Sequence, residues 1–178
     1  MRSKDFTKTL RITAFVACLF CLAPLALGQT VTATGTTSLS ATVSAEASLA
    51  VGDTPAFTPG STSFGNFTGS TTLTYKIRTT KTGGSGSITA LVTGDFGAGP
   101  SAPSVAGGAL KFTCTSDLGT PCSGSPTAST STATEVVHFD ANTHGNDKHA
   151  TVYWVLLNDP QYETGRYSAT VTFTISAN

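Results

Sequence analysis

Charged residues are scarce in this chain of 178 residues. Asp, Glu, Lys and Arg together make up 11% of it, against about 25% in a typical soluble domain. The formal net charge is zero, whereas nucleic-acid-binding domains carry a basic excess, so we expect no nucleic-acid partner. Met occurs once, and Lys and Glu, which favour helices, are few. These shortages disfavour a helical protein.

Thr and Ser are the residues in excess. From Gln29 onward the chain has 31 Thr and 18 Ser in 150 residues. Thr is branched at Cβ and packs well on a pleated sheet, and Ser is common in turns. Apolar residues make up 39% of the chain, which is enough to build a core. The composition therefore predicts a folded, all-β domain.

The first 28 residues have the pattern of a secretory signal peptide. A basic head carries Arg2, Lys4, Lys8 and Arg11, and an apolar run of 16 residues follows over 12–27. Small residues, Ala26 and Gly28, precede Gln29 at the positions that signal peptidase reads. A membrane anchor is the alternative, but the run is short of the roughly 20 residues that cross a bilayer. We therefore expect an exported mature chain, 29–178, that meets the membrane only during export and is secreted or held at the cell surface.

Two cysteines, Cys114 and Cys122, remain in the predicted mature chain. An even pair in an exported protein favours a disulfide, and Gly119 and Pro121 between them supply the bend for two strands to meet. A reactive thiol pair or half of a zinc site is the alternative. A structural zinc site would need a second pair of ligands, and the mature chain has no other cysteine.

Alternation of apolar and polar residues predicts strands along the whole mature chain. Leu73 and Ile77 point one way in one such segment, and Lys76 and Arg78 point the other way. The expected strands lie within 39–51, 71–80, 87–96, 110–114, 135–140, 150–157 and 167–176. We expect 71–80 and 87–96 to form a hairpin around the Gly-rich tract 81–86, and 97–108 and 120–134 to be exposed loops.

Seven to eight short strands in about 150 residues predict one domain, 29–178, with an antiparallel immunoglobulin-like β-sandwich fold. The expected core residues are the apolar members of the alternating segments. They are Leu73, Ile77, Ile88, Phe112, Trp154, Val171 and Phe173.

The densest polar cluster spans 138–149 and contains all three histidines of the chain. Imidazole and carboxylate groups at a loop tip could hold zinc or another transition metal. The candidate ligands are His138, Asp140, His144, Asp147 and His149. The alternative is a polar hairpin loop with its turn at Gly145-Asn146-Asp147, and we favour this alternative, so we expect no metal and no other cofactor.

Enzymatic and sugar-binding sites have weaker signals. No Gly-x-Ser-x-Gly elbow occurs, and phosphate-binding glycine loops need a helix. Carboxylates at Asp95, Asp117 and Glu163 could meet in space as a glycoside-cleaving pair. Aromatic residues could form a sugar platform, the candidates being Tyr153, Trp154, Tyr162 and Tyr167. Core or sheet packing is the more common role of such residues, and we predict no enzyme.

Two stretches resemble a known family. Residues 34–51 form an alternating segment that leads into Ser63-Phe64-Gly65-Asn66-Phe67, and residues 165–176 form an alternating tail. Both are similar to bacterial spore coat protein U and Csu-type fimbrial subunits. Trp154-Val155-Leu156 followed by Asp159-Pro160 also resembles the tryptophan-x-leucine surface domains of Gram-positive bacteria, in which the motif lies in the terminal strand.

The fimbrial resemblance implies a mechanism. Such subunits are incomplete sandwiches in which the N-terminal extension of the next subunit supplies the missing edge, a case of strand addition. Residues 29–43 have the form of such a donor strand, although they could equally be the first strand of their own sandwich. The resemblance implies an adhesive or structural surface protein whose partners are further copies, other surface subunits and a periplasmic chaperone. A self-contained sandwich that binds surface glycans is the alternative function.

Overall fold

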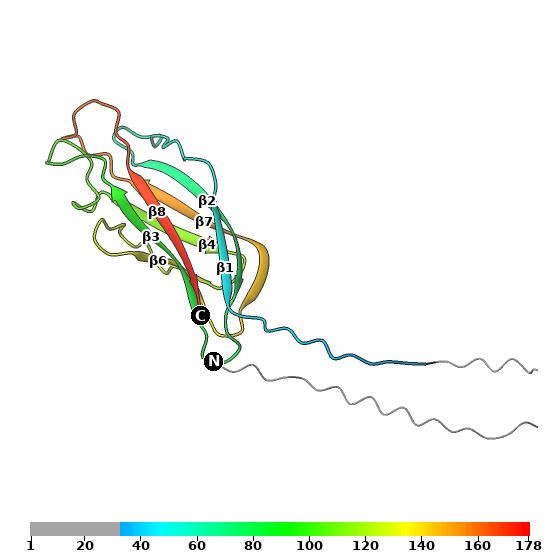
Figure 1. Cartoon of the computed structure of the whole chain (residues 1–178). Helices are drawn as coiled ribbons and strands as arrows, with labels where there is room; N and C mark the ends of the chain where they lie inside the picture. Colours follow the sequence, from blue (N-terminus) through cyan, green and yellow to red (C-terminus); the bar gives the residue numbers. More distant parts are fainter. Residues whose placement is uncertain (1–32) are drawn as a thin grey trace, which may run out of the picture. The chain divides into compact units, whose positions relative to one another are not determined.

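A computed structural model describes residues 33–178, and its regular elements are strands (Figure 1). In chain order they are β1 (Glu46–Val51), β2 (Phe67–Arg78), β3 (Gly86–Gly94), β4 (Leu110–Ser116), β5 (Thr120–Pro121), β6 (Thr134–Phe139), β7 (His144–Leu156) and β8 (Thr170–Ala177). Within 33–178 no helix is long and apolar enough to cross a membrane. The predicted signal peptide, 1–28, and the predicted mature start at Gln29 lie outside the described residues.

The strands form two four-stranded sheets, in the orders β1-β2-β7-β4 and β5-β6-β3-β8. Every neighbouring pair is antiparallel. The inward faces of both sheets contribute to one apolar core, which is the arrangement of a sandwich. The predictions of an all-β protein and of antiparallel pairing are therefore confirmed.

Burial follows the alternation that the sequence predicts. In β2, Leu73, Tyr75 and Ile77 are buried, while the residues between them are at least partly exposed. Five of the seven predicted core residues are buried: Leu73, Ile77, Ile88, Phe112 and Trp154. The other two, Val171 and Phe173 in β8, are only partly buried. The core is thus less well covered along β8 than elsewhere.

The predicted hairpin between 71–80 and 87–96 is wrong. Both segments are strands, but β2 pairs with β1 and β7, whereas β3 pairs with β6 and β8. The connection between them has seven residues, which is long enough to cross the roughly 10 Å between packed sheets. Alternation identifies a strand from its own residues, but it does not identify the neighbour with which that strand pairs.

Two predicted boundaries also change. The predicted strand 39–51 begins only at Glu46, because its partner β2 ends at Arg78, which lies opposite Glu46. The predicted turn at Gly145-Asn146-Asp147 lies inside β7, where the pairing with β2 shifts register. The chain instead turns at Asn142, which has a φ of 61°, a left-handed conformation that Asn tolerates better than most residues.

The two predicted loops are not wholly exposed. Within 97–108, Val105 is buried in the core, and within 120–134 the chain forms β5 and buries Ala128. Backbone hydrogen bonds hold the second segment against β4, since the N–H of Phe112 donates to Pro126 and that of Ala128 donates to Leu110. The second segment therefore covers the core beside β4.

A disulfide joins Cys114 in β4 to Cys122, which directly follows β5, with a Cα–Cα distance of 5.5 Å. The chain crosses from one sheet to the other between these residues. Gly119 allows the crossing because its φ is 85° and a Cβ there would lie 2.5 Å from the carbonyl oxygen of His138. The predicted disulfide is confirmed, and it links the two sheets along the β4–β5 side.

Candidate functional site

The β1–β8 side of the sandwich differs from the disulfide-linked side. β1 is the edge of one sheet and β8 is the edge of the other, and the two strands contact each other. Their inward apolar side chains are only partly buried. These are Ala47 and Leu49 of β1, and Val171, Phe173, Ile175 and Ala177 of β8. The two edges thus flank an incompletely covered stretch of core.

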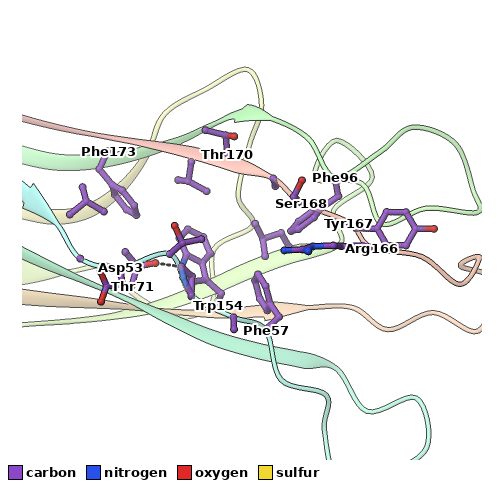
Figure 2. A pocket seen from close by; sticks show the side chains of 18 residues that line it. Asp53, Phe57, Thr71, Phe96, Trp154, Arg166, Tyr167, Ser168, Thr170 and Phe173 are labelled. Carbon is purple, nitrogen blue, oxygen red and sulfur yellow. Dashed lines mark hydrogen bonds between the residues drawn. The ribbon is translucent and has the colours of Figure 1, made fainter.

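A cavity of about 590 Å³ opens between these edges, toward the end where β8 begins (Figure 2). One wall is the end of β1 with the segment that follows it, 51–57, and the other wall is 166–171 with Phe173. The floor comes from three different strands, through Thr71 of β2, Leu110 of β4 and Trp154 of β7. We call this cavity, together with the inward side chains of β1 and β8, the β1–β8 groove.

Five aromatic side chains line the cavity, and they are Phe57, Phe96, Trp154, Tyr167 and Phe173. Trp154 lies between the two walls in Figure 2, with its ring centroid 6.3 Å from that of Phe173. Phe57 and Phe96 pack edge to face, 6.2 Å apart. The indole N–H of Trp154 donates to the buried Thr71 hydroxyl at 2.9 Å, so the single polar atom of the indole has a partner. This hydrogen bond fixes the orientation of the Trp154 ring in the floor.

The backbone of β8 offers hydrogen-bonding groups at this edge. In the described part of the chain, β8 pairs only with β3. The N–H of Asn178 points toward that neighbour, because it donates to the carbonyl of Ser85 at 2.9 Å. Since such groups alternate in direction along an antiparallel strand, the N–H and C=O groups of Val171, Phe173 and Ile175 face the groove edge. They are placed to pair with a further strand.

Residues 33–45 precede β1 and form no regular secondary structure. The large apolar side chains of this segment are exposed, Leu39 to 93% and Val43 to 69%. Leu39, Ala41 and Val43 recur at every second position, so an extended chain would present all three on one face. Residues 33–43, the described part of the predicted donor segment, therefore have no strand partner within 33–178.

The candidate metal ligands do not converge. The described residues contain no group of three or more His, Cys, Asp or Glu side chains that could hold a metal ion. His138 lies 3.3 Å from Glu135 and 3.6 Å from Asp140. The other two histidines have different neighbours, since His149 contacts the hydroxyl of Thr74 and His144 contacts the carbonyl of Asn142. The cluster in sequence separates because its residues divide between two sheets.

The candidate carboxylates have separate structural partners. Asp95 accepts hydrogen bonds from the N–H groups of Phe96, Val105 and Ala106 and from the Ser104 hydroxyl. Asp117 accepts one from the N–H of His149 at 3.0 Å. None of Asp95, Asp117 and Glu163 lines the cavity, whose charged lining residues are Asp53 and Arg166. The cavity thus lacks the pair of carboxylates that glycoside hydrolysis needs.

The candidate sugar platform is divided between two faces. Tyr153 and Trp154 are neighbours in β7 and point to opposite sides of the sheet, so Tyr153 is 46% exposed and Trp154 is buried. Tyr167 lines the cavity, and its hydroxyl donates to the carbonyl of Glu163 at 2.9 Å. A sugar would need an exposed ring face for stacking, and the ring of Trp154 has none to offer.

Comparisons of the chain with protein-family models, with curated proteins and with solved structures found no match.

Proposed function

We propose that the protein is an exported, pilin-like structural subunit with an immunoglobulin-like sandwich, and that it polymerises by strand addition. Residues 29–43 of one copy fill the β1–β8 groove of the next. The observation that carries this proposal is that one chain holds both halves of such a joint. One half is a groove with apolar side chains between two strand edges, and the other is a segment whose described part, 33–43, is largely exposed, alternately apolar and paired with no strand within 33–178.

The two halves match in form. Main-chain hydrogen bonds supply affinity in strand addition, and pockets for alternate side chains supply specificity. The edge of β8 offers backbone groups over Val171 to Ile175, and the cavity beside them is lined by apolar rings. A donor with apolar side chains at every second position would satisfy both. Its polar face, which is rich in Ser and Thr, would then continue the outer face of the sandwich.

A second copy is a better donor than the chain itself. To lie beside its own β1, the segment would have to reverse direction at Ser44 and Ala45, immediately before Glu46. Two-residue hairpin turns need positive φ and therefore favour Asn and Gly, and neither residue occurs there. The local sequence thus favours a segment that continues away from its own body into a neighbour.

The proposal also includes where the protein assembles and which partner it has before assembly. A polymer of this kind forms outside the cytoplasm, which agrees with the signal-like residues 1–28. A body whose groove exposes apolar side chains would benefit from a periplasmic chaperone that covers the groove until assembly. The proposed role is structural or adhesive and requires no catalytic residue and no cofactor.

The test is a chain that begins at Ser44, mixed with a synthetic peptide of residues 29–43. We expect the shortened chain to fold as a monomer and to bind the peptide. At a peptide concentration a hundredfold above Kd, binding adds about 2.7 kcal/mol to the free energy of unfolding. For a domain of this size that raises the melting midpoint by roughly 5–10 °C, measurable by circular dichroism.

The matched control is the same peptide with Leu39 and Val43 replaced by Asp, which keeps the backbone and removes the apolar face. We expect it to leave the melting midpoint unchanged. An unfolded shortened chain would mean that 29–43 is an internal strand and would overturn the proposal. A folded shortened chain whose melting midpoint neither peptide changes would also overturn the proposal.

A further inference from the structure

Arg78 holds the base of the N-terminal segment. This residue ends β2 and lies opposite Glu46, the first residue of β1. Its Nε donates to the carbonyl oxygen of Ser44 at 2.6 Å, and its Nη2 donates to the Glu46 carboxylate at 3.0 Å. One guanidinium therefore hydrogen-bonds to the chain at two residues, one inside β1 and one before the strand begins.

The first of these residues lies at the end of the proposed donor segment. Ser44 directly follows Val43, and Ala45 is the single residue between Ser44 and β1. Each extended residue spans at most about 3.6 Å, so little slack lies between the donor segment and the body. The Arg78 bond to Ser44 removes part of that slack.

We propose that Arg78 is a positioning residue that sets the direction in which the donor segment leaves its own body, and thereby the angle between neighbouring copies in the polymer. This inference rests on the proposed function, and its partner is a second copy of this chain. Arg78 lies outside the β1–β8 groove, so it does not contact the inserted strand. Its role is limited to the angle between neighbouring copies.

The chemistry of the side chain suits this task. The guanidinium is a planar fork whose N–H groups reach two acceptors at once, whereas a Lys ammonium is a single point of charge. The side chain is partly exposed, and one such contact has a small effect on stability. In a polymer, the same contact restrains the angle between every pair of neighbouring subunits. These small restraints together contribute to the bending stiffness of the polymer.

The test compares Arg78→Ala, Arg78→Lys and Lys76→Ala in the full mature chain. Lys76 is the matched control, because it lies on the same face of β2 and its partner is Asp147 at 3.4 Å instead of the N-terminal segment. We expect all three variants to polymerise. In electron micrographs, the persistence length should fall at least about twofold for Arg78→Ala, less for Arg78→Lys, and not at all for Lys76→Ala.

A second measurement examines the contact between Arg78 and Ser44 without a polymer. A spin label on Thr42→Cys, in monomers kept dilute, reports the motion of the segment two residues from Ser44. Cys114 and Cys122 are bonded to each other and do not compete for the label. We expect Arg78→Ala to increase the mobile fraction of the spectrum at least about twofold over Lys76→Ala, with Arg78→Lys between them.

The outcomes separate the two proposals. Equal persistence lengths and equal label mobility in Arg78→Ala and Lys76→Ala would overturn the role of Arg78 while leaving strand addition intact. Absence of polymers in the unaltered chain, with no binding of the 29–43 peptide, would overturn strand addition and the subunit angle with it. The label would then still decide whether Arg78 holds the segment.

Discussion

At the scale of single residues, Asp95 connects a loop to the sandwich. Asp95 directly follows β3, and its carboxylate accepts hydrogen bonds from three backbone N–H groups and one hydroxyl of the loop that contains the buried Val105. Burial raises the pKa of this carboxyl, but the hydrogen bonds from Val105, Ala106, Phe96 and Ser104 outweigh it, so the pKa lies below its ordinary value. The folded state therefore favours the ionised form.

This shift predicts how stability depends on pH. The stabilisation is complete above the unfolded pKa of about 3.9 and is lost as pH falls through the lower folded value. Asp95→Asn should cost about 1–2 kcal/mol of unfolding free energy at pH 7, because an amide is a weaker acceptor than a carboxylate. The gap between the two proteins should narrow as pH falls from 5 to 3 in urea titrations.

Ser104→Ala is the control for this prediction. It removes one of the four donors and leaves the titrating group with three, so it should cost less at pH 7 and keep most of the pH dependence of the unaltered protein. A gap between Asp95→Asn and the unaltered protein that stays constant from pH 7 to pH 3 would contradict the assigned cause.

At the scale of elements, the sequence predicts strands better than it predicts their partners. The alternation of Leu73, Tyr75 and Ile77 is a local property, and the strand it predicts is present. The hairpin with 87–96 fails because the choice of partner depends on which sheet can bury each inward face. The predicted start of the first strand at residue 39 is wrong for a similar reason. Arg78, the last residue of β2, pairs with Glu46, so the residues before Glu46 have no partner in β2.

The disulfide links the two sheets. We expect its removal to lower the stability of the fold and to leave peptide binding at the β1–β8 groove nearly unchanged. It joins β4 to the residue that follows β5, on the side of the sandwich away from the β1 and β8 edges. Replacing both Cys114 and Cys122 with Ala should lower the unfolding free energy by about 2–3 kcal/mol on the chain-entropy model. The affinity for the 29–43 peptide should change less than about twofold, as measured by calorimetry.

Labelling with an alkylating reagent checks the same bond directly. Without reductant, neither Cys114 nor Cys122 should react in the folded protein. Quantitative labelling of both would contradict the bond, and a large loss of peptide affinity in the double variant would show that the two sides of the sandwich are coupled.

At the scale of the whole molecule, the two sides of the sandwich differ in how completely they cover the core. One side is closed by the disulfide and by the segment beside β4 that buries Ala128. The other leaves β8 half-covered beside an aromatic cavity. The sequence predicts an alternating tail and a possible donor segment, because both are local patterns. It does not predict the cavity, because Phe57, Phe96 and Trp154 come from separate parts of the chain and meet only when the sheets pack.

The proposed assembly of several copies can be tested with two neighbouring substitutions, Leu39→Asp and Ser40→Asp, in a chain of residues 29–178. Both side chains are exposed in the single copy, so neither change should move the melting midpoint of the body by more than about 2 °C. In an inserted strand the two residues face opposite ways. Leu39→Asp would place a carboxylate in the apolar groove, which costs several kcal/mol, or at least about a hundredfold in affinity. We therefore expect monomers from Leu39→Asp and polymers from Ser40→Asp in sedimentation velocity, and equal assembly of the two would rule out insertion of this face.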